Sequence, residues 1–165
     1  MKTFFLTTLL LLFISLNGFC QKSDEFPSFE KFYSSIAETF KYPPQLRDNC
    51  IATITMMKVN FGSDGGTPTI SFSDSAHPSF AEYMQKIKGQ LDFKSIFEDL
   101  KKNGYESKTL LIPFQFDSEK IFECKSSISS PTLMKLYLFK GQPCSGEYII
   151  YPAVYFQVLV GQTHV

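Results

Sequence analysis

Histidine is scarce in this chain, and its scarcity limits the chemistry that the sequence supports. His77 and His164 are the two histidines among 165 residues. A serine or cysteine nucleophile therefore has few candidate bases. A zinc site, which is built mainly from histidine and cysteine, likewise has few ligands, and the cysteine spacings match no metal-site pattern. We expect no catalytic centre, no metal and no other cofactor.

An excess of charge of either sign is also missing. Sixteen lysines and arginines balance sixteen aspartates and glutamates, so the formal net charge is zero. A basic patch is the electrostatic footprint of proteins that bind nucleic acid or an anionic membrane surface. We therefore expect no nucleic-acid partner.

The sequence lacks an apolar run long enough to cross a membrane. The longest run, Phe4 to Leu16, has about 13 residues, whereas a membrane-spanning helix needs about 20. Lys2 precedes this run, and the small residues Gly18 and Cys20 stand at positions −3 and −1 before Gln21. This layout predicts a secretory signal peptide over residues 1–20, with cleavage between Cys20 and Gln21.

Two alternatives to cleavage at this site remain open. The apolar run is retained as a membrane anchor, or Cys20 is lipidated at the mature amino terminus. Lipoprotein processing prefers a small residue before the cysteine, and Phe19 stands there instead. The sequence therefore favours a periplasmic or secreted protein, without a membrane span in the mature chain, over a lipoprotein anchored through Cys20.

Residues 21–165 have the length of one domain, and such a chain can bury a substantial core. The eighteen phenylalanines are expected to form much of that core. Apolar residues from Phe29 to Phe40 recur at helical spacing, with Ser28 placed to cap the first turn. A second helical region begins at Pro78 and ends near Asn103, with a break around Gly89.

Three regions are predicted to be strands, because their apolar residues alternate. In the first, residues 50–61, Met57, Val59 and Phe61 share one face. The second covers residues 69–73, and the Gly-rich turn between them indicates a β-hairpin. The third covers residues 109–116 and contains Pro113, which belongs at a sheet edge or a bulge.

The rest of the chain predicts a carboxyl-terminal β-hairpin. Residues 133–139 and 148–160 both resemble strands, and a turn-like segment separates them. Cys124 and Cys144 flank part of this region, so we predict a disulfide between them, which leaves Cys50 unpaired. The predicted class is α+β: a small antiparallel sheet with one or two helices on one face, preceded by an amino-terminal helix and extended by the hairpin.

The order of motifs between residues 40 and 116 resembles that of a known family. Tyr42-Pro43 with Arg47 precedes the first strand, Asp64-Gly65 lies in the hairpin turn, and a second strand, a helix and an alternating third strand follow. This order resembles the carboxyl-terminal domain of TonB, particularly the stand-alone versions exported by Bacteroidetes-type bacteria. The resemblance covers roughly half of the mature chain. Residues from Glu119 onward have no counterpart in it.

The resemblance implies a protein-binding role rather than catalysis. TonB relatives engage extended receptor segments by strand addition, which implies a partner such as a segment of an outer-membrane receptor. It also implies that the docking strand is the third, presented by Thr109, Leu111, Pro113 and Gln115. Two other functions remain open: an inhibitor or accessory protein of an enzyme, and a hydrolase with an unrecognised site.

Overall fold

A computed structural model describes residues 26–120 and 123–160 of the chain. The predicted signal peptide, including Cys20, lies outside these residues. Within the described part, no helix has both the length and the apolar character needed to cross a bilayer.

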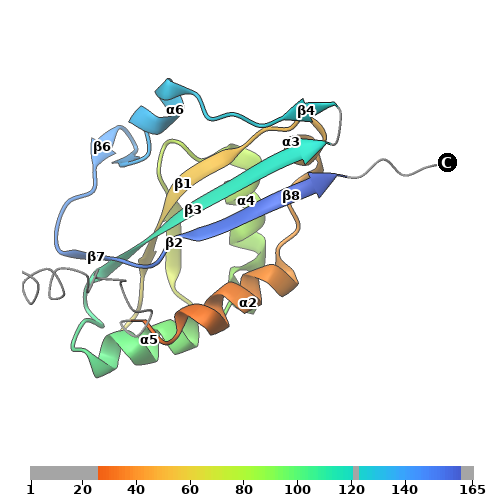
Figure 1. Ribbon diagram of the computed structural model, residues 1–165. Coiled ribbons are helices and arrows are strands. Elements are labelled where there is room, and N and C mark those ends of the chain that lie inside the picture. The colour runs from red at the N-terminus through yellow and green to blue at the C-terminus, as the bar shows by residue number, and fades with distance from the viewer. Residues whose placement is uncertain (1–25, 121–122, 161–165) are drawn as a thin grey trace, which may run out of the picture.

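The structure confirms the α+β class, with one main sheet and helices on one of its faces (Figure 1). The sheet core has the order β2-β1-β3, and both pairings are antiparallel. Short β4 pairs with the end of β3 in antiparallel fashion, and β7 and β8 pair with β3 in parallel. The bounds are β1 Thr53–Asn60, β2 Thr69–Phe72, β3 Thr109–Lys120, β4 Cys124–Lys125, β7 Tyr148–Ile150 and β8 Val154–Val160.

Three helices supply the apolar layer that covers the sheet: α2 (Phe29–Thr39), α4 (Pro78–Ile87) and α5 (Phe93–Lys102). A short η2 turn, Lys88–Gln90, separates α4 from α5, so the predicted break is present. The short helix α3 (Pro44–Asp48) leads from α2 into β1. Each of the three covering helices buries residues at helical spacing, as Phe93, Ile96 and Leu100 do on α5.

The start of α2 differs from the prediction. The Ser28 side chain does not cap the helix. Its hydroxyl instead shares a 2.8 Å hydrogen bond with the Tyr151 hydroxyl, and its N–H donates to Asp99 at 2.6 Å. The Ser28 hydroxyl can make only a few hydrogen bonds. Because it bonds with Tyr151, which is distant in sequence, it does not cap α2.

The predicted β1–β2 hairpin is present, and its register places one set of side chains beneath the helices. Val59 pairs with Ile70, and Met57 pairs with Phe72. Met57 and Val59 are fully buried, whereas Phe61, just beyond β1, is partly buried against Phe93 and Phe97. Alternation along β1 therefore identified the core face correctly.

The predicted carboxyl-terminal hairpin is wrong. Residues 130–134 form the short helix α6 (Ser130–Met134), and only Leu138–Phe139 (β5) pairs locally, with Gln142–Pro143 (β6). The final strand β8 does not turn back on this segment but lies parallel to β3. Val154, Phe156 and Val158 on β8 pack on the core, so burial against the helices selects the distant partner.

The segment between β4 and β7 crosses the face of the sheet opposite the three large helices. Lys58 of β1 points to that face, and its ammonium lies 4.9 Å from the centre of the Phe139 ring. Asp74, after β2, accepts hydrogen bonds from the backbone of Lys140 and Gly141. These contacts fix the β5–β6 hairpin over β1 and β2.

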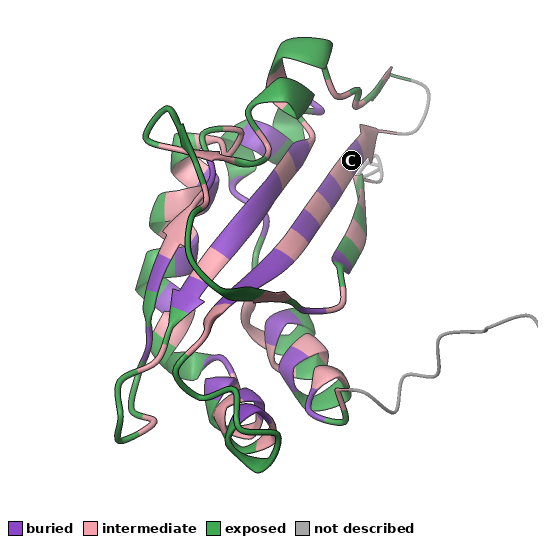
Figure 2. Ribbon diagram, turned by 90° about the vertical axis from the view of Figure 1, so that its left-hand side faces the viewer, coloured by how far each residue is buried: buried purple, intermediate pink, exposed green. Residues whose placement is uncertain are grey.

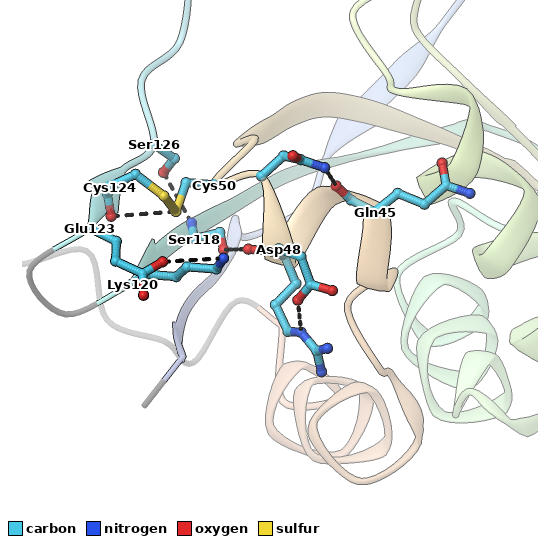
Figure 3. The surroundings of a disulfide bond; sticks show 10 residues. Gln45, Asp48, Cys50, Ser118, Lys120, Glu123, Cys124 and Ser126 are labelled. Carbon is cyan, nitrogen blue, oxygen red and sulfur yellow. Dashed lines mark hydrogen bonds and ion pairs between the residues drawn. A yellow bond between two sulfur atoms is a disulfide. The ribbon is translucent and has the colours of Figure 1, made fainter. Parts of the chain in front are cut away.

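The predicted disulfide between Cys124 and Cys144 is also wrong. Cys50 bonds with Cys124, and their Cα atoms lie 6.1 Å apart (Figure 3). β4 folds back on the same side of β3 as β1, which brings Cys124 to the loop that precedes β1. Cys144 follows β6 and is a free, half-buried cysteine. A disulfide is typical of a protein that folds in an oxidising compartment.

Candidate functional site

β3, the predicted docking strand, is internal in the sheet. β1 covers one of its edges, and β7 and β8 cover the other. The Thr109 N–H donates to Glu147, and the Leu111 carbonyl accepts from the Tyr151 N–H at 2.8 Å. The prediction that Thr109, Leu111, Pro113 and Gln115 present an open edge is therefore wrong, because the chain's own terminal strands occupy it.

Pro113 lies in the middle of β3 rather than at a sheet edge. Its missing N–H falls on the side that faces β7 and β8, as shown by the bonds of its neighbour Leu111. β7 ends at Ile150 and β8 begins at Val154, so the gap between them lies opposite Pro113. A proline is tolerated inside this sheet because the ladder has no paired residue on that side of Pro113.

The sheet ends in β2 on one side and in β7 and β8 on the other, and the edges of β2 and β8 differ in how open they are. β2 has four residues, and the Gln85 amide of α4 donates to its outward Ile70 carbonyl at 2.8 Å. A short, capped edge is a usual protection against unwanted strand pairing. β8 has seven residues and, within the described chain, pairs only with β3.

The outward backbone groups of β8 follow from the parallel ladder. Even-numbered residues of β8 direct their N–H and C=O groups to β3, since the odd-numbered residues of β3 face that side. Tyr155, Gln157 and Leu159 therefore direct theirs away from the sheet. The Tyr33 hydroxyl donates to the Tyr155 carbonyl at 2.9 Å, and no other described group bonds to these outward positions.

Exposed residues alternate with buried or partly buried ones along β8 (Figure 2), and several exposed residues beside this edge are apolar. The register places Tyr148, Ile150, Tyr155 and Leu159 on the sheet face opposite the three large helices, with exposed fractions of 47%, 55%, 48% and 61%. Gln157 lies between the last two. We call these five side chains, two from β7 and three from β8, the β8 strip; beside it lie the outward backbone groups of β8, of which the Tyr155 carbonyl alone has a described hydrogen-bond partner.

Two carboxylates lie next to the β8 strip. Asp117 and Glu119 of β3 line a groove of about 240 Å³ with Tyr155, Gln157 and the segment 125–128. The Tyr155 hydroxyl donates to Asp117 at 3.1 Å, and the Gln157 amide donates to Glu119 at 3.3 Å. The hydrogen bond to the Asp117 carboxylate raises the pKa of Tyr155 above its usual value.

The family-motif residues near β1 have structural roles. Tyr42 is buried, its hydroxyl donates to the Ile51 carbonyl at 2.6 Å, and its ring stacks on Phe116. Burial raises the pKa of Tyr42. The Pro43 carbonyl accepts the first hydrogen bonds of α3, and the exposed side chain of Arg47 pairs with Asp48. The Ser118 hydroxyl of β3 donates to the Arg47 carbonyl at 3.1 Å, which joins α3 to the sheet.

Asp64 and Gly65 shape the β1–β2 turn, far along β1 from Tyr42. The Asp64 side chain accepts a hydrogen bond from the Gly66 N–H at 3.2 Å, and Gly65 has a φ of +68°. The five motif residues are therefore not brought together into one site. Across residues 26–120 and 123–160, no group of three or more histidine, cysteine, aspartate or glutamate side chains is arranged to hold a metal ion.

Sequence reasoning missed Tyr155, Gln157, Asp117 and Glu119 as candidate site residues. Alternation over residues 154–160 indicated a strand, but not that it would become the sheet margin. Comparison of the chain with family models, with curated proteins and with solved structures finds no match.

Proposed function

We propose that this protein is an exported, non-catalytic binding module that receives an extended polypeptide as an added strand on β8. One observation carries the proposal: β8 is a seven-residue margin of the sheet with outward backbone groups at Tyr155, Gln157 and Leu159. Exposed apolar side chains accompany this edge. An added strand gains affinity from main-chain hydrogen bonds and specificity from alternate side chains.

The resemblance to the TonB carboxyl-terminal domain supports the same class of function. In this chain the edge of β3 is filled by β7 and β8, so the docking edge lies one strand further out. The partner we propose is an extended segment of another protein, such as an outer-membrane receptor. Export is supported by the signal-peptide pattern and by the disulfide.

The first test selects ligands from a displayed library of random seven-residue peptides. We expect enriched peptides with Kd values below about 100 µM. Bound peptide should slow hydrogen exchange at the amides of Tyr155, Gln157 and Leu159. Peptides that instead protect β2 or a helix, or a library that yields no binder, would overturn the proposal.

A matched pair of variants separates the backbone from the side chain. Gln157→Pro removes one outward N–H while leaving the inward bonds of β8 in place. Gln157→Ala keeps that N–H and loses only the side chain. The proline variant should bind the selected peptides at least about tenfold more weakly than the alanine variant. Slow exchange at the inward amides of Phe156 and Val158 verifies that both variants are folded.

A further inference from the structure

We propose that the added strand carries a lysine or arginine beside Gln157, with an apolar side chain two residues away on either side. This inference rests on the proposed function, because it names the chemistry of the segment that β8 receives. It is an inference about side-chain recognition, whereas the proposed function concerns the backbone edge.

The apolar positions follow from the β8 strip. Side chains of an added strand lie beside those of β8 on each face, with Cβ atoms about 5 Å apart for directly opposed residues. Tyr155 and Leu159 are four residues apart on the same face and are about half exposed or more. Covering both requires apolar side chains at positions i and i+4 of the partner, and position i+2 then lies beside Gln157.

The expected positive charge at position i+2 of the partner follows from two carboxylates on β3, the strand next to β8. Asp117 pairs with Gln157 across the β3–β8 ladder, and Glu119 pairs with Leu159. Two strand spacings separate an added strand from β3, about 10 Å in all. A long cationic side chain can lie across Gln157 and bring its head to these carboxylates.

One cation of the described chain, Lys125, lies directly opposite Glu119 in the β3–β4 ladder, whereas Asp117 has no cationic partner in the ladders. Asp117 and Glu119 accept hydrogen bonds from neutral groups, namely Tyr155, Gln115 and Gln157, and neither takes part in an ion pair between described residues. Lys125 lines the groove from the β1 side of β3, so its charge partly offsets that of Glu119 and leaves Asp117, opposite Gln157, as the main attraction for a cation over β8. A cation arriving over β8 approaches the carboxylates from the side opposite Lys125.

The test uses three capped peptides that differ only at their centre: Thr-Val-Thr-Lys-Thr-Val-Thr and its Gln and Glu counterparts. Binding to the full mature protein is measured at low and moderate salt, together with hydrogen exchange of the β8 amides. We expect the Lys peptide to bind about tenfold more tightly than the Glu peptide, with the Gln peptide between them. Added salt should narrow the difference.

An isosteric double variant assigns the preference to the two carboxylates. Asp117→Asn with Glu119→Gln keeps the shape of the groove and removes its negative charge. In this variant the Lys and Glu peptides should bind with affinities equal to within about twofold. A preference that survives the double substitution would overturn the assignment to Asp117 and Glu119.

The remaining outcomes separate this inference from the proposed function. If all three peptides protect the β8 amides with the same affinity for the unaltered protein, strand addition stands and the charge preference is wrong. If the Glu peptide binds best, the inference is overturned in the same way. If no peptide protects these amides, the proposed function fails and the inference fails with it.

Discussion

Gly65 occupies a position in the β1–β2 turn that a larger residue fits poorly. Its φ of +68° lies in the left-handed region, and a Cβ built on it would lie 2.3 Å from two ring carbons of Phe97. Two separate effects therefore oppose substitution, namely backbone strain and a clash with a ring that packs against Phe61. The Asp-Gly pair noted in the sequence thus sets the close approach of the turn to α5.

We predict that Gly65→Ala lowers the free energy of unfolding by about 2–4 kcal/mol, from strain and overpacking together. Gly104→Ala is the matched control, because Gly104 has a φ of +71° but nothing within 4 Å of its built Cβ. It should lower the free energy by only about 1 kcal/mol, from strain alone. Urea denaturation measures the free energy of unfolding of both variants. If the two substitutions lower it equally, the Phe97 ring moves aside without a loss of stability.

Among the secondary-structure elements, those from β4 to β8 form one segment whose start is held by the disulfide. Cys50 and Cys124 are separated by 74 residues in sequence, so their bond constrains a long loop in the unfolded chain. The bond also holds β4 beside the loop that precedes β1. From there the chain crosses the sheet and returns as β7 and β8.

We predict that removing both bonded cysteines, as Cys50→Ser with Cys124→Ser, lowers the free energy of unfolding by about 2–5 kcal/mol. Cys144→Ser should change it by no more than about 0.5 kcal/mol, as a half-buried, unpaired residue. Denaturation without reductant measures these changes. Peptide mapping under the same conditions should join Cys50 to Cys124, and a Cys124–Cys144 peptide would contradict the structure.

At the scale of the whole molecule, Tyr151 joins parts of the chain that are distant in sequence. It follows β7, is almost fully buried, and its ring contacts Phe26, Phe29 and Phe32 near the amino terminus. Its hydroxyl bonds with Ser28. Burial raises the pKa of Tyr151 well above its usual value of 10.0.

This raised pKa predicts a loss of stability in alkali. Below pH 10 the hydroxyl is protonated in both the folded and the unfolded states, so it contributes no pH dependence. Above pH 10 the unfolded state releases the proton first, and the free energy of unfolding falls by up to about 1.4 kcal/mol per pH unit from this group. Denaturation curves from pH 8 to 11.5 measure the slope.

Tyr151→Phe is the control for this slope, because it removes the titrating hydroxyl and keeps the ring. At pH 8 the variant should be less stable by about 1 kcal/mol, since Ser28 loses its partner. Above pH 10 its stability should fall less steeply than that of the unaltered protein, although Tyr42, whose pKa burial also raises, still titrates. Parallel curves for the two proteins would show that Tyr151 ionises normally in the folded state.

Between residues 29 and 116, the sequence by itself determined the main helices and strands and the faces that they bury. Helical spacing located α2, α4 and α5, and alternation with an Asp-Gly turn located the β1–β2 hairpin, because these signals depend on residues a few positions apart. The α+β class followed from their order. The same local signals identified residues 154–160 as a strand.

Only the tertiary structure decided which strands became neighbours. β8 pairs in parallel with β3 because its alternate side chains complete the core beneath the helices, and β4 turns toward β1, which brings Cys124 to Cys50 rather than to Cys144. Alternation of apolar residues predicts that a strand forms, but it does not predict which distant strand it pairs with. The candidate site depends on that choice, since the terminal strand both closes the edge of β3 and becomes the open margin of the sheet.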